Sequence, residues 1–453
     1  MGNLSPAFPA FQWPLVFLAA AVITAADGWA GEADVVPMRW ERFASSAPPS
    51  DDLQLAARPL LNAARYNLEW APSGAEKVEQ GWREFEKVDL HNFIRPACSA
   101  PAALAVVLKT SVFDEEAVGV SREEALARTL RLIRAAAHSH NRDSWRFPWQ
   151  SAFWAADLAQ AGWMLWDDLD PEARRLLAEI VEFEANRFLE PDYRVPYWNG
   201  EGGDTKAEEN AWNAMIHQIA CAMMPGHPNA PRWKEVGSEL MVSAYALEED
   251  LQNATIVDGK PVKDWLHGYN VRADGAVINH RILHPDYMTC VKFNLQAHIL
   301  QSLAGQTVPE AADFRAEFIW GTLAAKKWPS PPYNPPGGTI YVPGRAEVYY
   351  PQGTDRFVGR VAGYYVIGTW AHLLGWGKDL PDRPETWMRL RALTIVKNQE
   401  RHENRRLYAD DELTSFVPRE QNDFKRIADA YLALWLHAHQ ALCPTGNWRV
   451  PAQ

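Results

Sequence analysis

The segment from residue 149 to residue 189, WQSAFWAADLAQAGWMLWDDLDPEARRLLAEIVEFEANRFL, predicts two consecutive helices. The first begins near Pro148 and continues into the acidic stretch that ends it. Asp170 and Pro171 then supply an N-cap and a first-turn proline for the second helix. The order of cap, proline and helical period is typical of a chain built from helix pairs.

The helical period continues along most of the chain after residue 120. Ser121 and Glu124 form a predicted capping box in front of an apolar stripe with helical spacing. Strand patterns are scarce, and the two candidates, 338–342 and 346–350, are short and bounded by proline or glycine. Further helices are expected near residues 53–67, 77–88, 101–111, 207–223, 231–247, 288–304, 309–327, 357–375, 385–401 and 420–441.

The fold class predicted from this pattern is all-α. The chain has 453 residues, of which 47% are apolar, so it can bury a large core. Helices of similar length joined by long loops favour an (α/α) toroid of paired antiparallel helices, either incomplete or built from six hairpins. We expect residues 31–453 to form this single domain, with long aromatic loops.

Residues 1–30 are expected to be a secretory signal peptide. The apolar run from Pro14 to Ala26 has the length of a signal-peptide core and is too short to cross a bilayer comfortably. This predicts a secreted or periplasmic protein that has no membrane contact after cleavage. The four cysteines are widely spaced, so disulfides are allowed and not required.

The formal net charge of −12 argues against nucleic acid as a partner. An anionic substrate would need a local basic or amide-lined cleft that overrides this field. The sequence contains no Gly-rich phosphate loop, no HExxH and no GxSxG, and we expect no cofactor. His138 and His140 have poor spacing for a metal pair, so we expect no metal site.

Aromatic residues are abundant, with 21 tryptophans and 14 tyrosines. Several fall in predicted loops, where flat apolar rings can stack on sugar rings. Trp198, Tyr349 and Tyr350 are the candidates for such contacts. Each of them could equally fill a wide core.

A polar helix is predicted after the glycine-rich loop at Gly203. Thr205 and Glu208 read as a capping box, which gives Glu208 a structural role. Asn210 and His217 lie on one stripe of the helix and need hydrogen-bond partners if they are buried. They could tie helices together, or they could face a ligand near the positive end of the helix.

A second polar segment, Asp274-Gly-Ala-Val-Ile-Asn-His280-Arg-Ile-Leu-His-Pro-Asp-Tyr287, precedes a predicted helix. It resembles the catalytic segment of the helical-toroid polysaccharide lyases that act on chondroitin, hyaluronate, alginate and heparin-type polymers. In that family Asp-Gly is followed by a His and then a Tyr, and an Asn lies some tens of residues upstream. The matching positions here are His280, Tyr287 and Asn210.

The resemblance implies cleavage of a uronate polysaccharide by β-elimination. Asn210, with a protonated Glu209, would bind the carboxylate of the sugar and stabilise the developing charge. His280 or Tyr287 would remove the C5 proton, and Tyr287 would protonate the leaving oxygen. Arg281 is the nearest cation in the sequence that could lower the pKa of Tyr287.

Arg356 follows a loop rich in aromatic and polar residues. It joins the aromatic candidates as an expected substrate contact.

Two other functions remain open from the sequence. A glycoside hydrolase on the same scaffold would use a pair of carboxylates. Asp204, Glu208, Glu209 and Asp286 could supply that pair. A secreted carbohydrate-binding protein without chemistry would use the aromatic loops alone.

Overall fold

The structure is a computed structural model that describes residues 34–44, 50–81, 90–140, 149–191, 193, 195–198, 203–329, 337–356, 359–412 and 419–448. Helices dominate it, so the all-α prediction is confirmed. The predicted signal peptide, residues 1–30, lies outside the described residues. The long helices are α1 Asp51–Gly81, α2 Leu90–Lys109, α4 Arg122–His140, α5 Ser151–Met164, α6 Pro171–Asn186, α7 Ala207–Met223, α8 Ala230–Tyr245, α11 Lys292–Ala304, α12 Ala316–Ala324, α13 Ala362–Leu373, α14 Pro384–Gln399 and α15 Arg419–Ala438.

Short elements decorate this helical body. They are the one-turn helices α3 Glu115–Val118, α9 Val262–Trp265 and α10 Pro285–Met288, and two-residue strands. Three strand pairs are antiparallel: β1 Ile256–Val257 with β2 Lys260–Pro261, β3 Ile278–Asn279 with β4 Ile282–Leu283, and β6 Lys327–Trp328 with β7 Gly338–Thr339. Strand β5 Val308–Pro309 pairs in parallel with β8 Thr445–Gly446.

Two of the helix starts predicted from caps are confirmed, those of α6 and α4. The Asp170 carboxylate accepts a hydrogen bond from the Ala173 N–H at 2.9 Å, with Pro171 in the first turn of α6. The Ser121 hydroxyl accepts from the Glu124 N–H at 3.2 Å at the start of α4. Both contacts satisfy N–H groups that have no partner within the helix.

Two helix boundaries differ from the prediction because prolines lie inside helices. Residues 53–67 and 77–88 were expected to be separate, but α1 is continuous through Pro59 and Pro72. Likewise α2 begins eleven residues before the expected start at 101 and contains Pro96 and Pro101. A proline in a helix interior removes a backbone hydrogen bond, and burial of long apolar faces outweighs this loss here.

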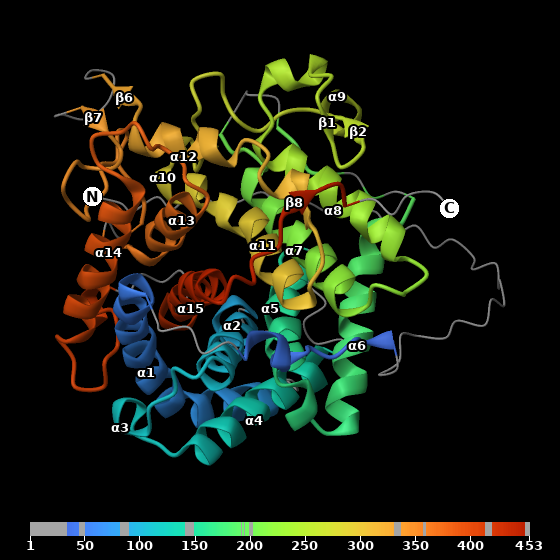
Figure 1. Cartoon of the computed structure of the whole chain (residues 1–453), viewed down its shortest axis with the longest axis vertical. Helices are drawn as coiled ribbons and strands as arrows, with labels where there is room; N and C mark the ends of the chain where they lie inside the picture. Colours follow the sequence, from blue (N-terminus) through green and yellow to red (C-terminus); the bar gives the residue numbers. More distant parts are fainter. Residues whose placement is uncertain are drawn as a thin grey trace, which may run out of the picture.

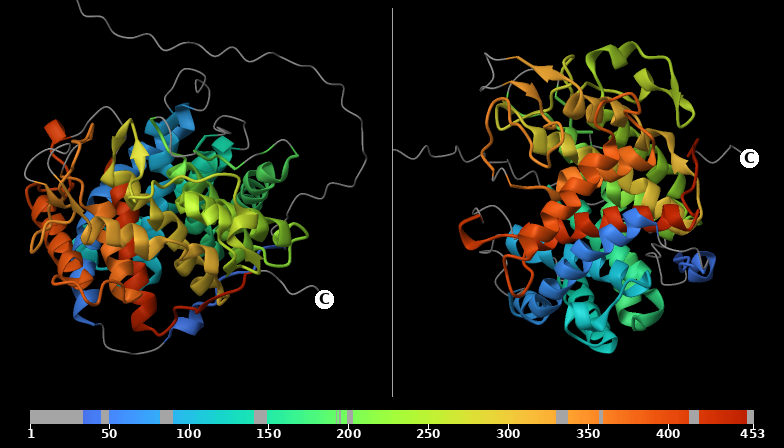
Figure 2. Two further views of the ribbon diagram at one scale, coloured as in Figure 1. Left: turned by 90° about the horizontal axis from the view of Figure 1, so that it is seen from above. Right: turned by 60° about the vertical axis from the view of Figure 1, so that its left-hand side comes forward.

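The most buried helices pack in a cyclic order. Helix α2 contacts α5, α5 contacts α7, α7 contacts α11, α11 contacts α15, and α15 contacts α2 (Figure 1). Outside this inner group lie α1, α4, α6 and α8, each of which contacts one or more of its members (Figures 1 and 2). Helix α14 also lies outside and contacts α13, which packs on α15. Every residue of α5 is buried, and every residue of α7 except Glu209. The toroid itself stays a prediction.

The centre of the inner helices is charged. The Lys425 ammonium on α15 contacts both carboxylate oxygens of Asp429, at 2.6 and 2.8 Å, and lies 3.8 Å from Asp157 on α5. Ser99 on α2 donates to Asp157 at 2.7 Å, and Gln296 on α11 donates to Asp429 at 3.3 Å. One buried network therefore joins four of the inner helices.

The described helices include none with the length and apolar character that a membrane crossing requires. All four cysteines are unpaired, and Cys98 and Cys221 are buried.

Replacement of Lys425 by methionine is expected to destabilise the fold strongly. The variant leaves two buried carboxylates without their cation, which costs roughly 3–5 kcal/mol. Burial already raises the pKa of Asp157 and of Asp429. A carboxyl group whose pKa is raised in the folded state destabilises that state more as pH rises, because its ionised form is disfavoured there. The variant's loss in free energy of unfolding should therefore grow from acidic to neutral pH.

Urea denaturation of Lys425→Met at several pH values measures this loss. Lys109→Met is the matched control, because it removes a partly exposed ion pair with Asp168 and should cost about 0–1 kcal/mol. Equal losses in the two variants would contradict the structural role of the buried network.

Candidate functional site

His280 occupies the tip of a two-residue β-hairpin. Strands β3 and β4 flank His280 and Arg281, whose φ angles are 50° and 68°. A turn with both central residues in the left-handed region normally carries asparagine or glycine. Two larger side chains in these positions store backbone strain, a feature that clusters at functional sites.

The glycine-rich loop before α7 holds this hairpin in place. The Thr205 N–H donates to the Ile278 carbonyl, and the Arg281 N–H donates to the Gly203 carbonyl, both at 2.7 Å. The Asp204 carboxylate accepts from the His280 N–H. The two polar segments identified in the sequence are therefore joined directly.

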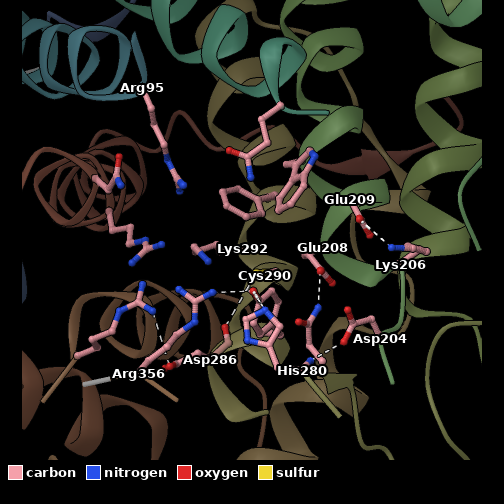
Figure 3. A pocket seen from close by; sticks show the side chains of 18 of the residues that line it. Arg95, Asp204, Lys206, Glu208, Glu209, His280, Asp286, Cys290, Lys292 and Arg356 are labelled. Atoms are coloured by element: carbon pink, nitrogen blue, oxygen red, sulfur yellow. Dashed lines mark hydrogen bonds and ion pairs between the residues drawn. The ribbon is translucent and has the colours of Figure 1, made fainter. Parts of the chain in front are cut away.

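Beside the hairpin lies a cavity of about 390 Å³ (Figure 3). Its walls come from the hairpin, from the start of α7, from helices α2, α10, α11 and α15, and from two loops. The lining residues are Arg95, Trp149, Gln150, Asp204, Lys206, Glu208, Glu209, Trp212, Asn279, His280, Asp286, Tyr287, Cys290, Lys292, Phe293, Arg356, Arg360, Asn422, Asp423 and Arg426.

A chain of polar contacts runs along one edge of the cavity. The Asp355 carboxylate contacts His280 Nδ1 through one oxygen and His284 Nε2 through the other, the latter at 3.0 Å. The other ring nitrogen of His280, Nε2, lies 3.3 Å from the Tyr287 hydroxyl. The Arg356 guanidinium donates to the same hydroxyl at 2.6 Å and lies 5.1 Å from the centre of the Tyr287 ring.

The protonation states of this chain follow from the partners. Burial opposes ionisation of Asp355, but hydrogen bonds from His284 and His280 outweigh it and lower the pKa of this carboxyl. An ionised carboxylate only accepts, so His280 carries its proton on Nδ1 and directs the Nε2 lone pair at Tyr287. Burial raises the pKa of Tyr287, and Arg356 only partly opposes this shift, so the phenol keeps its proton at neutral pH.

Cations form a second wall of the cavity. Arg360 is 3.7 Å from Asp286, and Arg426 pairs with Asp423. Among the described residues, the other three cations of this wall form no ion pair; they are Arg95, Lys292 and Arg356. Figure 3 shows Arg95, Lys292 and Arg356 spread along the cavity.

These cations are held at a cost. Burial lowers the pKa of Lys292 to about 7, and among the described residues this ammonium donates to the Thr289 carbonyl alone, at 3.1 Å. Burial and the neighbouring Arg426 lower the pKa of Arg95 to about 9. An anion bound between them would relieve both effects.

Acidic groups form the opposite wall. Burial, with Glu209 next to it, raises the pKa of Glu208 well above its ordinary range, and Glu208 accepts a hydrogen bond from Asn279. Burial also raises the pKa of Glu209, although Lys206 opposes the shift from 3.0 Å. The N-cap residue of α7 is Lys206 rather than Thr205, and no side chain caps the helix, so Thr205 and Glu208 do not form a capping box. This corrects the capping-box prediction.

The structure brings four of the candidate residues together in one cavity, namely Glu209, His280, Tyr287 and Arg356. Asn210 is not among the lining residues. It is fully buried and donates to the Pro196 carbonyl. This corrects the expectation that Asn210 lies beside His280 and Tyr287: the residues of α7 that line the cavity are Glu208, Glu209 and Trp212.

His217 shares the buried stripe of α7 with Asn210 and lies outside the cavity lining. Its ring packs 5.0 Å from Phe188, and burial lowers its pKa to about 3, so it stays neutral. The side chain of exposed Arg281 packs over Gly203, where an added Cβ would come within 2.7 Å of it. The cation beside Tyr287 is therefore Arg356, which corrects the role expected for Arg281.

The aromatic candidates also lie outside the lining residues. Tyr350 is buried and donates to Asp286 at 3.2 Å. The half-buried ring of Trp198 packs against the hydrophobic core. Tyr349 is half-buried and its backbone N–H bonds to the Ile340 carbonyl. These three residues contact other parts of the protein and do not line the cavity.

The residues that the sequence did not reveal are mainly cations of the helices. Arg95 lies within α2, Lys292 is the first residue of α11, and Arg426 follows Lys425 in the polar first half of α15. A basic residue on the buried face of a helix was the feature of the sequence that could have pointed to them, because such residues are rarely buried without a partner. Asp355 lies 75 residues from His280, so their contact could not be expected from spacing.

Comparison of the chain with protein-family models, with characterised proteins and with solved structures finds no match. The interpretation of the cavity therefore depends on its own geometry.

The Asp274-Gly275 pair that precedes the hairpin has a structural explanation. Asp274 accepts from the Ala276 N–H at 3.0 Å, and Gly275 has a φ of +84°. A Cβ on Gly275 would lie 2.3 Å from the Thr322 hydroxyl. Only glycine meets both constraints without strain.

Gly275→Ala is expected to lower the free energy of unfolding by about 2–4 kcal/mol, the sum of backbone strain and overpacking. Gly119→Ala is a matched control, because Gly119 has a φ of +81° and nothing within 4 Å of an added Cβ. The control should lose only about 1 kcal/mol. Chemical denaturation compares the two, and a loss at Gly275 no larger than at Gly119 would rule out the steric contribution.

Proposed function

We propose that the protein is a polysaccharide lyase that cleaves a uronate-containing glycan by β-elimination. The observation that carries the proposal is the meeting of His280 Nε2 and the Arg356 guanidinium at the Tyr287 hydroxyl, in a cavity where three cations form no ion pair with any described residue. The cyclic packing of α2, α5, α7, α11 and α15 supports an incomplete or six-hairpin (α/α) toroid as its scaffold.

The cationic wall supports an anionic substrate. The chain as a whole carries a formal charge of −12, which repels polyanions. Arg95, Lys292 and Arg356 supply the local field that overrides it, and a sugar carboxylate would provide the counter-ion that they lack among the described residues. Between partly buried groups this attraction is stronger than at the surface.

The elimination needs a base for the C5 proton, and His280 fits this role. Asp355 holds the proton of His280 on Nδ1 and so leaves Nε2 able to accept another. As the C5–H bond breaks, a double bond forms between C4 and C5 and the C4–O4 bond breaks. The imidazolium that forms is stabilised by Asp355, as a carboxylate stabilises a catalytic histidine elsewhere.

Tyr287 fits the role of the acid. Its raised pKa keeps the phenol protonated, and it can give its proton to the leaving O4. Arg356 stabilises the phenolate that forms during this step. The proton taken by His280 then returns the phenol to its starting state across the 3.3 Å contact, so the cycle has no net proton change.

The acidic wall offers neutral hydrogen-bond donors. Glu208 and Glu209, whose pKa values are raised by burial, can be protonated beside the substrate carboxylate or its hydroxyls. Glu209 was expected in this role, and Glu208 joins it. The secreted or periplasmic location expected from residues 14–26 would give such an enzyme access to a polymeric substrate.

Incubation of the protein with a panel of uronate-containing polymers tests the proposal. A lyase produces an unsaturated uronate, which is detected by its ultraviolet absorbance. New reducing ends without this absorbance would replace the proposal by the hydrolase alternative, which would use a carboxylate pair on the acidic wall. Binding without any product on the full panel would favour a carbohydrate-binding protein.

Tyr287→Phe should lower kcat roughly 10²–10⁴-fold, which is the contribution of one positioned acid. The same assay with Tyr66→Phe, which removes a phenol from α1, should show wild-type turnover. Circular dichroism of both variants checks that they fold. Wild-type turnover by Tyr287→Phe would remove the acid assignment.

Lys292 should make substrate binding depend on pH. Its pKa of about 7 means that the ammonium loses its charge as pH rises through neutrality, so KM for an anionic substrate should increase above pH 7. Lys292→Met should raise KM at pH 6 about tenfold or more, because a charge-assisted contact contributes about 1.5–3 kcal/mol. The variant should also lose this pH dependence.

Lys292→Arg and Lys397→Met are the controls for this measurement. The arginine keeps its charge across the range, so its KM should stay low at pH 8. Lys397 is exposed on α14, and its replacement should leave the profile unchanged. A Lys292→Met enzyme that keeps the wild-type KM profile would contradict the role of Lys292.

A further inference from the structure

Three potential metal ligands converge at the edge of the cavity. His280, His284 and Asp355 each offer one ligand atom, a ring nitrogen or a carboxylate oxygen, and these three atoms lie within 4.8 Å of one another. Asp355 already bridges the two rings, with one oxygen toward each. The hairpin and the loop before α13 bring these groups together from positions 71 and 75 residues apart.

The ligand types indicate which ion would bind. Two imidazoles and one carboxylate match the ligand sets of zinc and other divalent transition metals, whereas magnesium and calcium prefer oxygen ligands throughout. A site with three protein ligands leaves a fourth position for water.

The three side chains are also positioned before any ion arrives. The His284 side chain has no exposed surface, and its ring packs 4.8 Å from that of Tyr287. The side chains of His280 and Asp355 are 39% and 49% exposed, so an ion can enter from solvent. A buried fixed ligand with two accessible ones requires little rearrangement on binding.

We propose that His280, His284 and Asp355 form a binding site for a divalent transition-metal ion of the zinc type, and that the bound ion inhibits the enzyme. The binding itself is independent of the proposed function, and the inhibition rests on it. An ion on Nδ1 of neutral His280 moves the ring proton to Nε2. That nitrogen then donates to Tyr287 and can no longer accept the C5 proton.

Titration of the metal-free protein with Co²⁺ tests the binding without any substrate. Bound Co²⁺ has visible absorption bands that report nitrogen and oxygen ligands, and we expect one equivalent per chain. His284→Gln and Asp355→Asn should each weaken binding at least tenfold, since even partners that only orient metal ligands contribute about 10–100-fold. Asp355→Asn is isosteric and half-exposed, so it remains informative if the buried His284 variant fails to fold.

His372→Gln is the matched control. His372 lies 3.3 Å from Asp52 and 3.6 Å from Glu385, so it offers one imidazole with two carboxylates outside the cavity. Its replacement should leave the cobalt spectrum unchanged. Absence of a cobalt spectrum in the wild type, or an unchanged spectrum in both His284→Gln and Asp355→Asn, would overturn the site.

The inhibitory role has its own readout. Zn²⁺ should stop formation of the unsaturated product, and a chelator should restore it. Activity that disappears on chelation and returns with Zn²⁺ would overturn inhibition while leaving the site in place. Failure of the lyase assay with every polymer would bear on the proposed function and would leave the cobalt result unaffected.

Discussion

Lys425 places a buried ammonium between Asp157 and Asp429 where helices α2, α5, α11 and α15 meet. Each charge by itself would be costly to bury, and their mutual attraction together with hydrogen bonds from Ser99 and Gln296 offsets that cost. Apolar helices can slide against one another with small changes in energy, whereas a shift of any of these four helices would break the polar contacts of this network. It therefore fixes the relative positions of the helices that carry the cavity.

The cavity extends this pattern to groups whose charges are not balanced within the described residues. Arg95 projects from α2 and Lys292 from the start of α11. In the buried network, Lys425 lies near two carboxylates, those of Asp157 and Asp429. Arg95 and Lys292 have no carboxylate partner among the residues described. The lowered pKa of Lys292 measures the resulting cost. Groups with strongly shifted pKa values concentrate at functional sites, which agrees with the anionic substrate proposed for this cavity.

The strained backbone of the β3–β4 hairpin positions His280 at the cavity. His280 and Arg281 adopt left-handed conformations that larger residues disfavour. Hydrogen bonds from the 203–205 loop hold the hairpin, so the imidazole stays between Asp355 and Tyr287. This arrangement permits both proposed roles of His280, because one ring nitrogen faces Asp355 and the other faces Tyr287.

The sequence by itself determined the helical class, because periodic apolar spacing and local caps such as Asp170 depend only on near neighbours. The resemblance of residues 274–287 to a lyase segment selected His280 and Tyr287 and implied a role for Glu209, and the polar loop that precedes Arg356 selected that residue; all four line the cavity. Local spacing could not show that α1 and α2 continue through prolines, since burial against other helices decides this.

Which face of α7 meets the cavity was decided only by the tertiary structure. Asn210 and Glu208 are two residues apart, and both are polar. The contacts of the helix with its neighbours seal Asn210 in the interior and leave Glu208 at the cavity. The partners Asp355 and Arg356 were likewise fixed by packing, because a contact across about 70 residues of chain depends on how the intervening helices fold.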